Sequence, residues 1–226
     1  MPRGNLSKLV DLDGIPLLVR RNRRARRILL RVSADARQAI LTLSPRHSER
    51  EALRFARDKR EWLAARLGPA PALLGEGSII PFRGDEIRIA VSADPRTASR
   101  LENNVLTVGG PMAGARVRRF LREEARRALT ELAQEKAAHV GCACPPVRVK
   151  ELVSRWGSCG SCLNFSWRLI LAPHVALDYV VAHEVAHLRH RNHGAAFWSL
   201  CRELSADFAQ GHTWLKREGS QLHRLF

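Results

Sequence analysis

The sequence predicts an α+β protein, and three observations indicate this class. Short runs in which apolar and polar residues alternate, as in strands, are frequent over residues 15–110. Two long segments, residues 49–67 and 113–139, carry apolar side chains at helical spacing. An apolar stretch from residue 174 to about residue 191 contains the sequence HEVAH. With 226 residues, the chain can form one large domain or two small ones.

Residues 1–110 are predicted to form a basic, β-rich N-terminal region with one helix. Ser48 is a suitable N-cap for the helix at 49–67, because its hydroxyl can accept a hydrogen bond from the first turn. The segment 68–78 is rich in Pro and Gly and predicts a loop. The sequence shows no internal repeat. Strands are expected at 15–21, 27–33, 39–44, 79–84, 85–92 and 104–110.

Residues 111–226 are predicted to form a second region that carries the chemistry. The helix at 113–139 should end at Gly141, since glycine readily adopts the left-handed conformation that closes a helix. Pro173 suits the start of the next helix. The expected order is a helix at 113–139, strands within 147–159 and at 164–173, and helices from 174 to about 191 and from 195 to about 207.

Arginine dominates the charge of the chain. The formal net charge is +16, with 33 Arg and 5 Lys. The densest run comprises Arg20, Arg21, Arg23, Arg24, Arg26, Arg27 and Arg31. Such a surface could attract nucleic acid or nucleotides, although a general bias towards Ala and Arg also explains the charge. No apolar run reaches the roughly 20 residues that span a bilayer, so no membrane association is expected.

The cysteines and the N-terminus favour a cytoplasmic protein. Five cysteines, an odd number, argue against a disulfide framework. The first residues lack the layout of a secretory signal. Two of the thiols, Cys159 and Cys162, could form a four-thiolate zinc site with Cys142 and Cys144, but a C-x-C pair beside two prolines is a poor ligand loop.

The strongest chemical signal is His183-Glu184-Val185-Ala186-His187, an H-E-x-x-H motif. Residues four apart lie on one face of a helix, so both imidazoles can reach one ion. Glu184 is rotated by about 100° from His183, where it can contact a water molecule without binding the metal. These positions predict a Zn²⁺ site with Glu184 as general base. A surface helix with incidental histidines would not explain their apolar surroundings.

A third protein ligand is required, and His193 is the favoured candidate. His190 lies about 10 Å from His183 along a straight helix, so three side chains of one helix cannot converge on one ion. Asn192 and Gly194 flank His193 and are residues that tolerate a left-handed turn. His193 should therefore turn back to the ion. The alternatives are carboxylates of the following helix, Glu203 and Asp207.

Four motifs, in this order and spacing, resemble the YgjP-like metallopeptidase family, a zincin-type group similar to the SprT-like proteases. They are SRWGSC, NFSWRLILAP, LDYVVAHEVAHL and NHGAAFW. The resemblance implies a zincin-like domain in which the active-site helix packs on a mixed or antiparallel sheet. It also implies zinc ligands His183, His187 and His193, with Glu184 catalytic. The segment Arg155, Trp156, Gly157 and Ser158 would be a strand at the sheet edge beside the cleft, where a substrate binds.

Three functional hypotheses follow. The first is a zinc metallopeptidase acting on a peptide or protein substrate. The second is a metal-dependent nucleoside triphosphate pyrophosphatase, an activity described for some members of the family. The third is a nucleic-acid-binding protein with a structural metal. The residues that could stabilise a developing oxyanion are Arg155, Arg168, Tyr179 and His212, and the sequence does not separate them. It also leaves the oligomeric state open.

Overall fold

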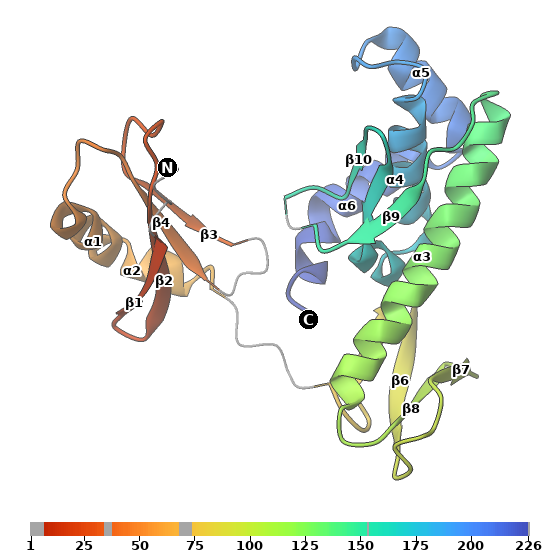
Figure 1. Ribbon diagram of the computed structural model, residues 1–226, viewed down its shortest axis with the longest axis horizontal. Helices are drawn as coiled ribbons and strands as arrows, with labels where there is room; N and C mark the ends of the chain where they lie inside the picture. Colours follow the sequence, from red (N-terminus) through yellow and green to blue (C-terminus); the bar gives the residue numbers. More distant parts are fainter. Residues whose placement is uncertain (1–6, 34–37, 68–73, 153, 226) are drawn as a thin grey trace. The chain divides into compact units, whose positions relative to one another are not determined.

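The computed structural model describes residues 7–33, 38–67, 74–152 and 154–225, which divide into two compact units (Figure 1). The division falls between Pro71 and Ala72. Residues 68–73, part of the predicted loop, lie outside the described residues. The class is α+β, as predicted. None of the described helices has both the length and the apolar character needed to cross a bilayer.

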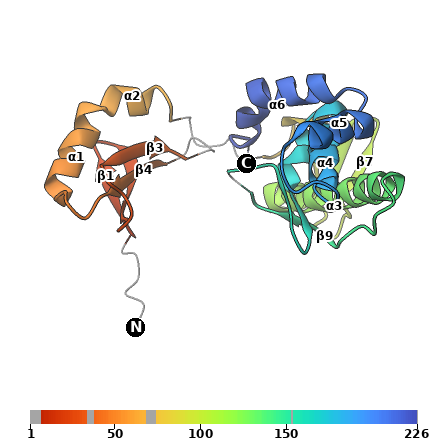
Figure 2. The ribbon, with the colours of Figure 1, turned by 90° about the horizontal axis from the view of Figure 1, so that it is seen from above.

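The first unit contains a mixed four-stranded sheet and two helices. The sheet order is β1-β2-β4-β3, formed by β1 (Ser7–Leu12), β2 (Ile15–Arg21), β3 (Leu29–Val32) and β4 (Ala39–Leu43). Ser48 caps α1 (Glu49–Asp58) through a capping box with Glu51, as its position predicted. A short helix, α2 (Arg60–Ala64), follows. Figure 2 shows both helices beside the sheet, where their buried residues join those of β2 and β4 in one core.

The second unit begins with a sheet of the same topology. Its order is β5-β6-β8-β7, formed by β5 (Ile79–Phe82), β6 (Asp85–Ser92), β7 (Arg100–Glu102) and β8 (Val105–Gly109). In both sheets the successive pairs are antiparallel, parallel and antiparallel. Both first hairpins turn through two residues of positive φ, which matches the twist of paired strands. The fold therefore contains a structural repeat that the sequence does not reveal.

The remainder of the second unit holds a three-stranded sheet and four α-helices. The sheet order is β10-β11-β9, with β9 (Val147–Lys150) parallel and β10 (Gly157–Cys159) antiparallel to β11 (Leu163–Ser166). The helices are α3 (Ala113–His139), α4 (His174–Ala186), α5 (Ala195–Leu204) and α6 (Phe208–Leu222). Figure 2 shows α4 between α3 and α6, and it also contacts β10. The sequence of α4 is apolar because the helix is packed between these elements.

Several elements differ from the sequence-based expectation. The strand predicted at 164–173 ends at Ser166, and Trp167–Leu171 form a 3₁₀ helix, η1. All five residues of η1 are buried, so their apolar-polar alternation does not mark an exposed face. Arg168 is buried because it pairs with Glu151. Strands β1 and β7 and helix α6 were not predicted. The helix predicted at 49–67 is divided into α1 and α2, and α4 ends at Ala186 rather than near residue 191. The strands at 79–109 share a compact unit with α4, whereas the sequence analysis placed them in the N-terminal region, before its boundary at residue 110.

Candidate metal centre

Helix α4 and the segment that follows it bring three histidines together. His183 lies in the last turn of α4, and His187 is its C-cap residue. His193 lies two residues before the start of α5. Potential ligand atoms of these three side chains all lie within 4.8 Å of one another. Among the described residues, no other group of three or more His, Cys, Asp or Glu side chains is close enough to hold a metal ion.

The turn that brings His193 back differs from the one predicted. After α4, Leu188 and Arg189 donate backbone hydrogen bonds to residues three positions earlier, which tightens the last turn. Neither Asn192 nor Gly194 has a positive φ, and Gly194 is extended with φ −76° and ψ −177°. The predicted left-handed turn is therefore wrong. The chain changes direction through the tightened turn and an extended N-cap instead.

The distances and hydrogen bonds of the three imidazoles fit a zinc ion. The Nε2 atoms of His183 and His193 lie 3.3 Å apart. Tetrahedral zinc with typical zinc–nitrogen bonds separates its nitrogen ligands by about 3.3 Å. Nδ1 of His187 lies 3.0 Å from the carbonyl oxygen of His190, so Nδ1 carries the proton and donates it, which leaves Nε2 free as a ligand. The three histidines therefore suit a zinc ion.

Burial keeps the imidazoles of His183 and His187 in their neutral form, so protons do not compete with a metal ion for the ring nitrogens. Burial, together with the neighbouring His187, His193 and His212, lowers the pKa of His183 to about 4. Burial also lowers the pKa of His187. A histidine binds metal in its neutral form, so both side chains are ready to act as ligands at neutral pH. Phe197, which is fully buried, packs against all three rings with centroid distances of 4.6–5.0 Å.

Glu184 belongs to α4, and its side chain packs against strand β10. Its side chain is buried, and burial raises its pKa to about 7, while Arg155 and a backbone hydrogen bond from Cys159 act in the opposite direction. A Cβ atom on Gly157 would lie 2.6 Å from Cγ and 2.7 Å from Oε1 of Glu184. Glycine is therefore required at this position of β10, because no larger side chain leaves room for the carboxylate.

A pocket of about 360 Å³ joins these groups. It is lined by Arg155, Gly157, Ser158, Cys159, His183, Glu184, His187, Arg191 and His193. Of the predicted substrate segment, Arg155, Gly157 and Ser158 line the pocket, whereas Trp156 stacks on His223 with ring centroids 4.7 Å apart. Trp156 also lies against Gly219 of α6. Arg155 precedes the first residue of β10, so the strand itself begins with Gly157.

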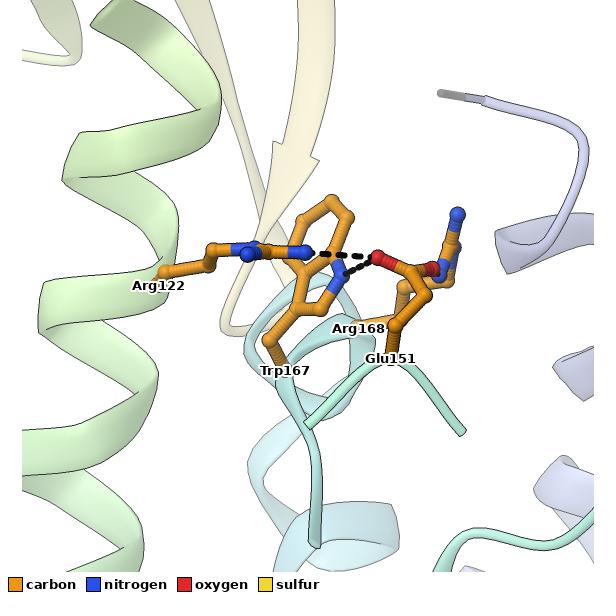
Figure 3. A network of polar contacts seen from close by, with 4 residues as sticks. All are labelled: Arg122, Glu151, Trp167 and Arg168. Carbon is orange, nitrogen blue, oxygen red and sulfur yellow. Dashed lines mark hydrogen bonds and ion pairs between the residues drawn. The ribbon is translucent and has the colours of Figure 1, made fainter. Parts of the chain in front are cut away.

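The candidates for an oxyanion stabiliser lie in different places. Arg168 is bound to Glu151 beside Trp167 and does not line the pocket (Figure 3). The Tyr179 ring is 6.2 Å from that of His183 and 5.5 Å from that of His212. Only Arg155 lines the pocket, which makes it the best placed of the four.

The alternative ligands lie outside the cluster. Glu203 pairs with His139 at 3.2 Å, and Asp207 is the N-cap residue of α6. The carbonyl oxygen of His190 accepts a hydrogen bond from Nδ1 of His187, and the ring of His190 is not part of the cluster. The described thiols of Cys142, Cys144, Cys159 and Cys162 do not gather into a four-ligand site.

Two residues at the site were missed by the sequence analysis. Arg191 lines the pocket, and Phe197 supports the three imidazoles. Phe197 lies in the first turn of α5, in the NHGAAFW motif that also contains His193. Arg191 had no local signal, because arginine is abundant throughout the chain.

A helix and the turn after it therefore present three histidines beside the carboxylate of Glu184. This arrangement is typical of metal-dependent hydrolases. The model of the YgjP-like metallopeptidase domain matches residues 26–218, so the chain belongs to the YgjP-like family. The resemblance found in the sequence is thereby confirmed. The family indicates a metal-dependent hydrolase. No curated protein and no solved structure matches the chain.

Proposed function

We propose that the protein is a zinc-dependent peptidase. The observation that carries the proposal is the convergence of three imidazoles in a pocket that also contains the buried carboxylate of Glu184. His183, His187 and His193 would hold the ion. Zinc, when bound, would polarise the substrate carbonyl and lower the pKa of a water molecule.

In this proposal, Glu184 moves the proton. Its carboxylate lines the same pocket as the three imidazoles, and the backbone N–H of Cys159 fixes its orientation. It accepts a proton from the attacking water and donates it to the leaving amine. A base whose pKa lies near neutrality suits both transfers. Arg155, exposed at the pocket, would stabilise the negative charge on the carbonyl oxygen.

Strand β10 offers a place for the peptide. It is an outer strand of its sheet and pairs with β11 alone among the described strands. An extended peptide that adds to such a strand by main-chain hydrogen bonds is held without a requirement for one sequence. Gly157 and Ser158 of β10 line the pocket, so a peptide bound along them passes the metal site.

The decisive experiment combines metal content with turnover. Purified protein should bind one zinc per chain and hydrolyse unfolded protein or internally quenched peptides, and a chelator should abolish hydrolysis. Glu184→Gln should keep the zinc and lose turnover by at least about 100-fold, since a positioned acid-base group contributes this much. An unchanged rate in that variant would contradict the mechanism.

A nucleotide is the second candidate substrate. Arg155 and Arg191 both line the pocket, and guanidinium groups beside a divalent cation suit phosphate groups. If the protein is a nucleoside triphosphate pyrophosphatase, release of pyrophosphate should depend on zinc and decrease in Arg191→Ala. Parallel assays with peptides and nucleoside triphosphates separate the two candidates, because the peptidase mechanism predicts turnover only of the former.

A further inference from the structure

A second groove in the same unit concentrates positive charge. It has a volume of about 710 Å³, lies between α3 and β9, and shares no lining residue with the metal pocket. Its cationic lining residues are Arg118, Arg119, Arg122, Arg126, Arg148 and Lys150. Glu123 is the one carboxylate among the described residues that line it.

Most of these cations lack an acidic partner. Arg119 pairs with Glu123 at 3.1 Å, and Arg122 pairs with Glu151 at 2.7 Å. The remaining four cations are exposed and form no ion pair within the part of the chain that the structure describes. Positive charges on both walls repel one another and destabilise the fold. An anionic occupant would remove this repulsion.

The shape of the groove indicates an extended chain. All four residues of β9, Val147–Lys150, line it. Successive side chains of a strand point to opposite faces, so a groove lined by four consecutive residues runs along the strand's edge. Strand β9 pairs with β11 alone among the described strands. A strand with one partner leaves a row of backbone N–H and C=O groups available to an added strand.

The chemistry of the lining favours a peptide over nucleic acid. Ala115, Val147 and Val149 supply apolar surface between the cations. No aromatic residue is among the described residues of the lining, whereas single-stranded nucleic acid is usually held by aromatic stacking. A strand in which acidic and apolar residues alternate would match both the cations and the apolar surface.

The groove is held in shape from one end of β9. Glu151 follows β9 directly and accepts hydrogen bonds from Trp167 Nε1 at 2.8 Å and from Arg122 at 2.7 Å, while its other oxygen pairs with Arg168 (Figure 3). Since Trp167 and Arg168 are buried in η1, this network fixes both the end of β9 and one arginine of the opposite wall. A preformed site loses less entropy on binding.

We propose that the α3–β9 groove binds an extended acidic segment of a partner protein, which adds to β9 as a strand and places its carboxylates on the groove cations.

The test uses the full-length chain with Glu184→Gln, so that the probe is not cleaved. The probe is a short fluorescent peptide in which valine and glutamate alternate, and binding is followed by fluorescence anisotropy. Arg148→Glu with Lys150→Glu should weaken binding by at least about tenfold, because attraction becomes repulsion at two contacts. The matched control is Arg202→Glu with Lys216→Glu, which makes the same change in net charge at exposed residues of α5 and α6. Its affinity should stay within about twofold of the parent.

A second probe tests strand addition independently of any variant's folding. The same peptide with alternate backbone nitrogens methylated keeps its charge but cannot form the main-chain hydrogen bonds, so it should not bind. Equal binding of both peptides would overturn the proposal. Tighter binding of a single-stranded oligothymidine, lost with Arg148→Glu and Lys150→Glu, would also overturn it and assign the groove to nucleic acid.

Discussion

At the scale of single residues, the site depends on the ionisable carboxylate of Glu184, which packs closely against strand β10. Glu184 is 6% exposed, and burial raises its pKa to about 7. Gly157 of β10 lies so close to this side chain that an added Cβ would meet Cγ of Glu184 at 2.6 Å. Two predictions follow from these contacts, one electrostatic and one steric.

The electrostatic prediction concerns the metal-free protein. The pKa of Glu184 is higher in the folded chain than in the unfolded chain, so the folded state binds the proton more tightly. Stability from this group is full at low pH and is lost as pH rises from about 4.5 to about 7, at no more than about 1.4 kcal/mol per pH unit. Glu184→Gln removes the loss. It should therefore raise the melting temperature relative to wild type at about pH 8 and not at about pH 5. An equal change at both values would contradict the raised pKa.

The steric prediction uses two glycines of the same hairpin. Gly157→Ala should displace Glu184, because the added Cβ would meet Cγ at 2.6 Å. We expect a loss of about 1–3 kcal/mol in the free energy of unfolding and at least about tenfold lower turnover, with zinc retained. Gly160→Ala is the matched control, since nothing lies within 4 Å of a Cβ at that position. Chemical denaturation and peptide hydrolysis measure both effects. Similar results for the two variants would remove the steric argument.

At the scale of elements, α4 is held in place by a buried ion pair. Nζ of Lys136 on α3 lies 2.6 Å from Oδ1 of Asp178 on α4, and it also donates to the carbonyl of Leu204 at the end of α5. One lysine therefore joins the helix that carries His183 to two neighbouring helices. The contact thereby joins α4 to the end of α5, the helix that begins two residues after His193.

Removing one partner of this pair should be costly. Lys136→Met leaves the carboxylate of Asp178 without its partner in a mostly buried position, and we expect a loss of about 3 kcal/mol in the free energy of unfolding. The double variant Lys136→Met with Asp178→Leu should recover much of this loss, since no unpaired charge remains. Urea denaturation of the single and double variants measures the coupling. A double variant no more stable than Lys136→Met would show that the pair does not join α3 to α4.

Elements whose ends are set by local rules could be predicted from the sequence. Helix α3, its end at Gly141 and the capped start of α1 follow local rules, and they match the prediction. The strand expected at 164–173 failed because burial on all sides overrides a two-residue alternation. His190 was excluded on the assumption of a straight helix, whereas α4 ends at Ala186 and the carbonyl oxygen of His190 binds Nδ1 of His187. The turn that carries His193 could not be derived correctly, because it depends on i to i−3 hydrogen bonds rather than on Asn192 or Gly194.

At the scale of the whole molecule, the chain uses one strand arrangement twice. The sheet of β1–β4 and the sheet of β5–β8 share strand order and pairing, and each is followed by a helix. Sequence alone did not show this repeat, because different residues satisfy the same pattern of burial and turns. The predicted arginine run lies in the first unit, around the turn between β2 and β3, where all its members except the half-buried Arg20 are exposed. Nucleic-acid binding by that run stays a prediction.

The metal site belongs to the second unit, and the proposed function depends on its three histidine ligands. The most direct test is X-ray absorption spectroscopy of the zinc-loaded, full-length protein. Three histidine ligands predict nitrogen and oxygen neighbours with the multiple-scattering pattern of imidazole, and His193→Ala should lose one imidazole. Sulfur neighbours in the wild-type spectrum, or a spectrum unchanged by His193→Ala, would contradict the three-histidine centre.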